Sequence, residues 1–388
     1  MAPIRVLELR SVRGTGGGPE KTIMLGAAQA DPREFAVTVC YIRDQRDAAF
    51  RLDERARGLG LDYLEVHERN SFDPSIWSAL RRVIRERQIQ IVHAHEYKTD
   101  LLALLLGARE PVIPLSTVHG WTGHSDRERR FYYPLDRRLL ARYPRLVAVS
   151  GQIKDELVAS GSDPARVTVV LNAIDPDRFR RDPARVPDAR ARFGWTPADY
   201  VIGAVGRLEP QKRFDLLIDA GASLRATYPA LRLMIAGEGS SREALVRHAA
   251  TALPGACTFL GHVDDVTAVH EAMDLFVQSS DYEGTPNAVL EAMALESPIV
   301  ATAAGGTAEV ALHGQHALIV APGDAGVLAR AIDEALTGRD ATQARRIAAR
   351  RRVEGELSFA ARMRRVEDID RDLVREGGPR RRGLLRWS

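Results

Sequence analysis

Cysteine is scarce in this chain of 388 residues, where only Cys40 and Cys257 occur. Two thiols exclude a disulfide scaffold and a zinc site built mainly of thiolates. The longest apolar run, Leu101–Leu106, is far shorter than the roughly 20 residues needed to span a bilayer. The stretch Met1–Gly18 carries no apolar core of signal-peptide length. These absences predict a soluble protein of cytoplasmic type.

Lysine is also scarce, because nearly all basic residues are arginine and lysine occurs only at Lys21, Lys98, Lys154 and Lys212. The formal net charge of +3 is too weak to suggest a nucleic-acid partner. Hydrophobic residues make up 45% and charged residues 28%, which is typical of a globular protein with sizeable cores. The length suits two or three domains.

Short β-branched apolar runs alternate with longer amphipathic stretches along most of the chain. This alternation predicts an α/β fold of two Rossmann-like, doubly wound domains whose parallel strands end at a shared cleft. The predicted strands are Ile4–Leu9, Val37–Ile42, Ile91–His95, Leu115–Val118, Leu146–Val149, Val167–Leu171, Tyr200–Val205, Leu231–Ala236, Thr258–Leu260, Leu275–Val277, Pro298–Thr302 and Ala317–Val320.

The alternation stops between Asp175 and Asp199, a proline-rich and charged stretch without an apolar period. We therefore predict an N-terminal domain over residues 1–175, a linker over 176–198 and a C-terminal domain over 199–358. The remainder, 359–388, contains a helical pattern at Phe359–Val374 and a basic tail, and it could cross back to the N-terminal domain.

Two loops carry residues suited to phosphate. The glycine cluster Gly14–Gly18 follows the first strand, but Pro19 occupies the third glycine position of the dinucleotide fingerprint, and a flexible turn explains it equally well. Arg207 and Lys212 follow the strand Tyr200–Val205, where a guanidinium and an ammonium could bind phosphate. The alternative for this pair is a solvated loop.

Two carboxylates flank a predicted helix start. Pro286 and Asn287 suit the first positions of a helix, whose free amides would attract an anion. Glu283 lies in the turn before this helix, and Glu291 lies one turn into it. A carboxylate can accept hydrogen bonds from the vicinal hydroxyls of a sugar or ribose, although carboxylates near a helix N-terminus are also common without a ligand.

This arrangement resembles the family-four retaining glycosyltransferases, which have the two-domain glycosyltransferase-B architecture. Glu283 and Glu291, with seven residues between them, match the Glu-x₇-Glu hallmark of that family. The resemblance runs from Gly16 to about Phe359. Further matching segments are Val118–Gly120, Leu171–Asp175, Ile235–Gly239, Gly261–His262 and Gly305–Glu309.

The resemblance implies an acceptor-side N-terminal domain and a C-terminal domain that binds a nucleotide sugar. It implies that Arg207 and Lys212 bind the donor diphosphate, Glu291 the ribose hydroxyls and Glu283 the transferred sugar, with His119 beside the reacting face. His119, Glu283, Arg207 and Lys212 are thus the predicted catalytic residues. The other implied donor-binding residues are Gly17, Gly284, Thr285, Pro286, Asn287, Ala288 and Val289, and a weaker acceptor-side match covers Gly16 and Lys98.

We expect no cofactor and no metal, because no Asp-x-Asp triplet lies at a strand end and no His, Cys and carboxylate group has convincing ligand spacing. The cations and the helix N-terminus could neutralise the leaving diphosphate. For His93 and His95 we predict core positions, since both share one face of a buried strand. Retention follows from the resemblance, and a front-face mechanism is the hypothesis.

The predicted partners are a nucleotide-sugar donor, with uridine or guanosine as base, and a glycan or lipid-linked acceptor of a hexose-type sugar. The stretch Arg127–Arg145 holds seven arginines against Glu128 and Asp136, with interleaved aromatic residues. It could dock on anionic lipid at the inner face of the membrane, or be a solvated charge run. Two other functions stay open: an NAD(P)-dependent oxidoreductase and a non-catalytic nucleotide-sugar binding protein.

Overall fold

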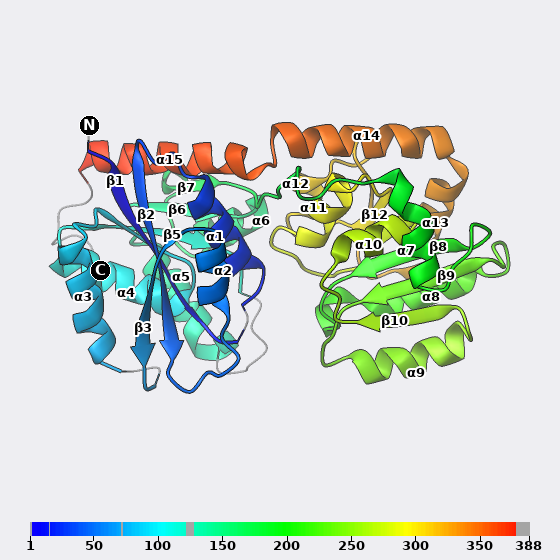
Figure 1. Ribbon diagram of the computed structural model, residues 1–388, viewed down its shortest axis with the longest axis horizontal. Coiled ribbons are helices and arrows are strands. Elements are labelled where there is room, and N and C mark those ends of the chain that lie inside the picture. The colour runs from blue at the N-terminus through cyan, green and yellow to red at the C-terminus, as the bar shows by residue number, and fades with distance from the viewer. Residues whose placement is uncertain (1, 15, 71–72, 122–127, 378–388) are drawn as a thin grey trace. The chain divides into compact units, whose positions relative to one another are not determined.

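The computed structural model describes residues 2–14, 16–70, 73–121 and 128–377. Contacts divide the chain into two compact units: unit 1 is Met1–Asn172 with Phe359–Ser388, and unit 2 is Ala173–Ser358. Each unit is built on one parallel sheet between helices (Figure 1). The predicted α/β class with two doubly wound halves is confirmed. The segment predicted as a linker, 176–198, lies within unit 2 and contains helix α7 (Val186–Arg192).

The sheet of unit 1 has the strand order β3-β2-β1-β4-β5-β6-β7. Its strands are β1 (Ile4–Val12), β2 (Phe35–Asp44), β3 (Asp62–Glu68), β4 (Ile91–Ala94), β5 (Ile113–Val118), β6 (Arg145–Ala148) and β7 (Val167–Val169). The sequence pattern missed β3, because Asp62–Glu68 alternates with charged residues instead of forming an apolar run. Strand β3 lies at the edge of the sheet and pairs with one strand only, β2.

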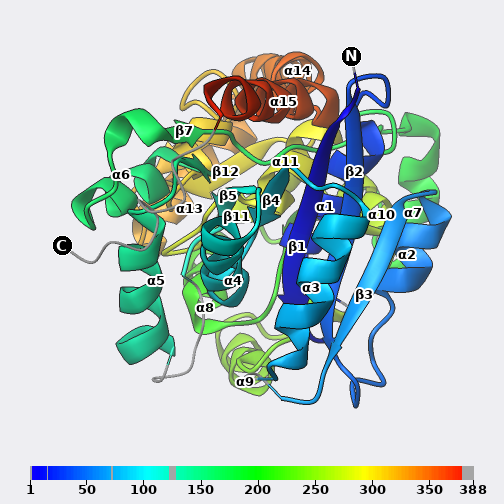
Figure 2. The ribbon, with the colours of Figure 1, turned by 90° about the vertical axis from the view of Figure 1, so that its left-hand side faces the viewer.

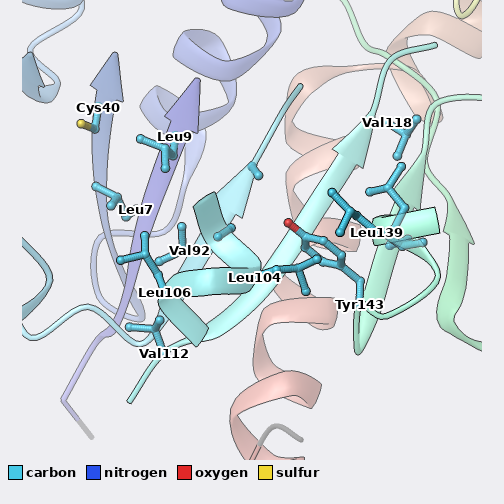
Figure 3. Packing of buried hydrophobic residues seen from close by; sticks show 14 of the residues in the cluster. Leu7, Leu9, Cys40, Val92, Leu104, Leu106, Val112, Val118, Leu139 and Tyr143 are labelled. Atoms are coloured by element: carbon cyan, nitrogen blue, oxygen red, sulfur yellow. The ribbon is translucent and has the colours of Figure 1, made fainter. Parts of the chain in front are cut away.

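Helices cover both faces of this sheet. They are α1 (Gly18–Gln29), α2 (Leu52–Gly58), α3 (Ser75–Glu86), α4 (Tyr97–Arg109), α5 (Tyr133–Leu140), α6 (Gly151–Ala159) and α15 (Phe359–Glu376). On one face, Leu7, Leu9 and Val92 belong to the same buried cluster as Leu104 of α4 and Leu139 of α5 (Figure 3). Alternation along each strand sends the neighbouring side chains to the opposite face.

Helix α15 covers that opposite face. Its buried residues Met363, Val366, Ile369 and Leu373 recur every three or four positions, which places them on one side of the helix. They pack with the buried side chains of β1, β4, β5 and β6, which are Val6, Ile91, Leu115 and Val147. Helix α15 also contacts α1 (Figure 2). Helix α15 therefore completes a hydrophobic core that also includes β1.

The sheet of unit 2 has the order β10-β9-β8-β11-β12-β13. Its strands are β8 (Tyr200–Val205), β9 (Leu231–Ala236), β10 (Cys257–Gly261), β11 (Leu275–Gln278), β12 (Ile299–Thr302) and β13 (Leu318–Val320). Besides α7, its helices are α8 (Phe214–Leu224), α9 (Arg242–Ala252), α10 (Val266–Ala272), α11 (Asn287–Ala294), α12 (Thr307–Val310), α13 (Ala325–Thr337) and α14 (Arg339–Gly355). The order reverses between β8 and β11, so the loops after these two strands lie at the switch point where such folds bind ligands.

Among the described residues, no helix is both long and apolar enough to cross a bilayer. Arg127, the start of the predicted lipid-docking stretch, lies outside those residues, as do residues 378–388 of the basic tail.

Candidate active site

The loops after β8 and β11 bring together two residues that lie 71 positions apart. Lys212, in a short 3₁₀ turn before α8, donates from Nζ to Oε1 of Glu283 at 2.5 Å. Ser280 donates from Oγ to the same oxygen at 2.6 Å. Glu283 is only 8% exposed, and a buried carboxylate needs such partners because removing its charge from water is costly. The sequence pattern did not identify Ser280 as a partner of Glu283.

Helix α11 begins at Asn287, four residues after Glu283. Pro286 occupies the N-cap without a side-chain cap, as the sequence predicts for a helix start that leaves amides for an anion. Glu291 is buried within the helix, as is Val289, and Thr285 is buried in the turn before it. Asn287 and Ala288 are half-buried in the first turn. The predicted donor-binding segment therefore forms one continuous turn and helix start.

Arg207 is placed differently from its predicted partner. It is exposed just after β8, and its side chain makes no hydrogen bond or ion pair with any residue that the structure describes. Lys212 is engaged by Glu283, whereas Arg207 has its guanidinium free for a ligand. The structure thus brings together Lys212 and Glu283, but it does not bring Arg207 into hydrogen-bond contact with either.

Two glycines outside the predicted site shape these loops. Gly305 has a φ of +55°, and a Cβ there would overlap the carbonyl oxygen of Glu283. Its neighbour Gly306 donates from its amide to the carbonyl of Gly284 at 2.9 Å. Gly237, with a φ of +141°, would likewise overlap the carbonyl oxygen of Gly206, next to Arg207. Glycine is needed at both positions because the backbones approach too closely for a side chain.

In unit 1, the carboxylate of Glu20 accepts a hydrogen bond from the glycine loop Gly14–Gly18. Gly17 is the N-cap of α1 and donates its amide to Oε2 of Glu20 at 2.6 Å. Arg10 of β1 binds the other oxygen of Glu20 and also donates from Nη1 to the carbonyl of His95 at 2.6 Å. Burial alone would raise the pKa of Glu20, but Arg10 and the loop amides lower it below its usual value. Gly16, at a φ of +71°, packs against the Glu20 side chain.

His119 lies at the end of a buried polar chain. Its Nε2 is 3.3 Å from Nδ1 of His95, whose Nε2 is 2.5 Å from Oε2 of Glu8. His93 approaches Oε1 of Glu8 through Nδ1 at 3.1 Å, and its Nε2 lies 2.7 Å from Oγ1 of Thr117. His93 and His95 are buried, as predicted, but they form a polar cluster instead of packing as apolar core.

Strand alternation explains this cluster. On the face covered by α15, β1 and β4 each carry an apolar residue first and a polar residue two positions later: Val6 precedes Glu8, and Ile91 precedes His93. The missed signal was a charged residue, Glu8, inside a strand expected to be buried. The donor atoms of Glu8, His93 and His95 also lie within 4.8 Å of one another, a set that could hold a metal ion. The expectation that no such group has ligand spacing was therefore wrong for these three residues.

Lys98 is engaged too. It lies in the first turn of α4, and its ammonium contacts the buried carboxylate of Glu68 at the end of β3. Because β3 was missed in the sequence, Glu68 was missed as its partner. An acceptor group bound at Lys98 would therefore have to share its ammonium with Glu68.

Comparisons with known proteins agree with this geometry. Residues 16–178 match the description "Glycosyltransferase Family 4", and residues 186–352 match "Glycosyl transferases group 1". Glycogen synthase of Mycobacterium tuberculosis is 32% identical over 281 residues, which cover 69% of this chain and 65% of that protein. The glycosyltransferase EpsD of Bacillus subtilis, named as putative, is 29% identical over 280 residues, covering 69% of this chain and 73% of EpsD.

Solved structures share the fold. HepE of Anabaena, crystallised with UDP, has a TM-score of 0.83 at 18% identity and covers 95% of this chain and 100% of its own. Sucrose-phosphate synthase of Thermosynechococcus elongatus has a TM-score of 0.80, also at 18% identity, over 96% of this chain and 100% of its own. The two-domain glycosyltransferase-B architecture is therefore shown, and the chain belongs to the family 4 glycosyltransferases.

Proposed function

We propose that the chain transfers a hexose-type sugar from a nucleoside diphosphate sugar to a glycan or lipid-linked acceptor, with retention of anomeric configuration and without a metal. The observation that carries this is the contact between Lys212 and Glu283 beside the start of α11. An ammonium, a carboxylate and free helix amides supply the groups that a diphosphate and a sugar hydroxyl require. Structural neighbours solved with UDP and UDP-glucose support a uridine nucleotide as the first donor to test.

The chemistry follows from charge. When the sugar–phosphate bond breaks, negative charge develops on the leaving diphosphate, and Lys212, Arg207 and the N-terminus of α11 would stabilise it. A phosphate oxygen would accept the proton of the attacking hydroxyl on the same face of the sugar. Family membership removes the support for the oxidoreductase alternative, and the intact Lys212–Glu283 pair argues against a protein that only binds nucleotide sugars.

Thermal stabilisation by UDP, UDP-glucose, GDP and GDP-mannose, each with and without EDTA, tests this proposal. A ligand that binds only the folded state at roughly a hundred times its Kd adds about 2.7 kcal/mol to the free energy of unfolding. We expect one sugar nucleotide to raise the melting temperature equally with and without EDTA. Stabilisation by none of them, or only after adding Mg²⁺, would contradict the donor assignment or the metal-free mechanism respectively.

Peripheral membrane contact is a further part of the proposal. Phe131 is 64% exposed and Leu135 43% exposed on adjoining helical turns, next to the exposed Arg138. Exposed apolar side chains beside arginine suit an anionic lipid surface. Flotation with phosphatidylglycerol vesicles tests this contact: the Phe131→Ser and Leu135→Ser double variant should lose binding, and a wild-type protein that stays unbound would refute it.

A further inference from the structure

The hydrogen bonds around Glu8 assign its two histidine partners one proton arrangement. An ionised carboxylate only accepts hydrogen bonds, so the imidazole nitrogens facing Glu8 must carry protons: Nδ1 of His93 and Nε2 of His95. Burial disfavours the charged form of Glu8, but its contacts with His93 and His95 lower its pKa below its usual value. The nearby guanidinium of Arg362, which α15 buries, adds a compensating positive charge.

The arrangement then propagates to His119. His95 is buried, Arg10 donates to its carbonyl, and the nearby carboxylate of Glu8 already faces the buried guanidinium of Arg362. A further positive charge is therefore disfavoured, so the imidazole of His95 is neutral and carries one proton; burial lowers its pKa in agreement with this. Since that proton is on Nε2, its Nδ1 can only accept, and Nε2 of His119 must donate to it across 3.3 Å. Burial and the charge of Arg10 also keep His119 neutral by lowering its pKa. Nδ1 of His119 is thereby left as a hydrogen-bond acceptor.

We propose that Glu8 and His95 are positioning residues that hold His119 in the Nε2–H tautomer, so that its Nδ1 accepts a hydrogen bond from a sugar hydroxyl. The inference rests on the proposed function for the identity of the ligand, but not for the tautomer. It sets a chemical requirement on the substrate: the group facing His119 must be a donor. Replacing that hydroxyl by hydrogen should weaken binding of the sugar portion while leaving nucleotide binding unchanged.

A bound metal is the competing explanation for the same three residues. A cation held by Glu8, His93 and His95 would displace the protons from the nitrogens that face the carboxylate. Two observations favour protons: both nitrogens already lie at hydrogen-bond distance from Glu8, and the charges of Arg10 and Arg362 act on the same groups. A dication beside two guanidinium groups would have only one carboxylate in contact with it.

Long-range ¹H–¹⁵N spectra of ¹⁵N-histidine-labelled full-length protein at pH 7.5 report each tautomer directly. We expect His119 and His95 protonated at Nε2, and His93 protonated at Nδ1. His95→Gln keeps a donor to Glu8 but loses the contact with His119, so His119 should become a tautomer mixture. The matched control His93→Asn also keeps a donor to Glu8, and it should leave His119 unchanged.

Turnover supplies the second readout. With UDP-glucose as probe, His95→Gln should reduce kcat for sugar release by about ten- to a hundredfold, as small misplacements of a reacting group do. The Kd of His95→Gln for UDP should be unchanged. The kcat of His93→Asn should stay within about twofold of the wild-type kcat. Equal losses in both variants would reduce the polar chain to a structural role and overturn the proposal.

The two proposals fail separately. An Nδ1–H tautomer of His119 in the wild-type spectra would overturn the tautomer proposal, whatever the sugar donor is. So would a shift of the His93 and His95 resonances together on addition of one equivalent of Zn²⁺. Failure of the wild-type protein to bind UDP or UDP-glucose would instead count against the proposed donor, and the spectra would still decide the tautomer.

Discussion

At the scale of single residues, Lys212 lies both in a buried ion pair and in the predicted donor-binding site. Its ammonium is mostly buried and contacts a carboxylate that is also buried, so each charge depends on the other. A ligand phosphate could share this ammonium because lysine offers three donors. Removing Lys212 should therefore affect donor binding and the folded state together, and the two effects need separate measurements.

We expect Lys212→Ala to weaken UDP binding by at least about tenfold, or about 1.4 kcal/mol, because a phosphate-binding charge is lost. Isothermal titration with UDP measures this. Lys154→Ala, which removes a lysine from α6 in unit 1, is the control and should bind UDP like wild type. Since Lys212→Ala also leaves Glu283 without its cation, circular dichroism must confirm that the variant is folded. Unchanged UDP affinity in both Lys212→Ala and Glu291→Ala would refute the site.

His270 makes the stability of unit 2 depend on pH. It is buried in α10, its Nδ1 lies 3.1 Å from Oγ of Ser297, and its Nε2 has no partner among the described residues. Burial first, and then the charge of Arg181, lower its pKa to about 3. Between that value and the unfolded value near 6.5, the unfolded chain binds a proton that the folded chain does not.

The free energy of unfolding should therefore fall as the pH decreases from about 6.5, by at most about 1.4 kcal/mol per pH unit for this one histidine. Urea titrations at pH 7.5, 6 and 5 measure the slope. His270→Asn keeps a polar group near Ser297 without the titrating ring, so its slope should be shallower. Identical slopes for wild type and His270→Asn would disprove the assignment.

At the scale of elements, short loops after the strands decide where the site residues lie. The turn at Gly305 packs on the backbone of Glu283, and the Gly237 turn packs on Gly206. These turns follow β12 and β9 and pack against the loops after β11 and β8, which carry the predicted donor-binding residues. A change in either turn should move those residues even though neither glycine contacts a ligand through a side chain.

Gly305→Ala should both destabilise the protein and weaken UDP binding, because its Cβ would overlap the Glu283 carbonyl. Gly314→Ala is a matched control: it has a similar positive φ of +75° and no atom within 4 Å of an added Cβ. Both substitutions carry a backbone penalty of roughly 1–2 kcal/mol, so the excess loss for Gly305→Ala measures the clash. Thermal denaturation with and without UDP separates these terms. Equal behaviour of the two variants would contradict the role of this turn.

At the scale of the whole molecule, the chain forms two units whose boundaries do not follow the sequence order. Helix α15 returns to unit 1 and buries Val366 and Leu373 against its sheet. Unit 1 therefore needs the last part of the chain for a complete core, whereas unit 2 is formed by one continuous segment.

Val366→Asn should destabilise unit 1 by about 2–4 kcal/mol, since it replaces a buried aliphatic side chain by a polar one. Arg364→Asn, at an exposed position of the same helix, is the control and should have little effect. Hydrogen exchange followed by mass spectrometry in increasing urea resolves the two units. The Val366→Asn effect should be confined to unit 1, and added UDP should protect unit 2; equal destabilisation of both units would contradict the division.

The sequence by itself determined the parts of this protein that depend on local periodicity. Apolar runs identified all strands except β3, whose charged residues resemble those of a loop, and proline at the start of α11 identified its free N-terminus. Glu283 and Glu291 could be identified as candidate site residues because both lie close to one predicted helix start, where their spacing in the sequence determines their relative positions. The family motifs added the identity of the fold, which the comparisons confirm.

The tertiary structure alone decided which distant residues meet. Lys212 with Glu283, Lys98 with Glu68 and His119 with Glu8 through His95 are contacts between different strands and loops, and no local pattern encodes such pairs. Buried charges have to find partners across the fold because each costs too much free energy alone. For that reason the sequence could name the candidate residues, but only the packing of strands, turns and α15 fixed their partners and the charges they hold.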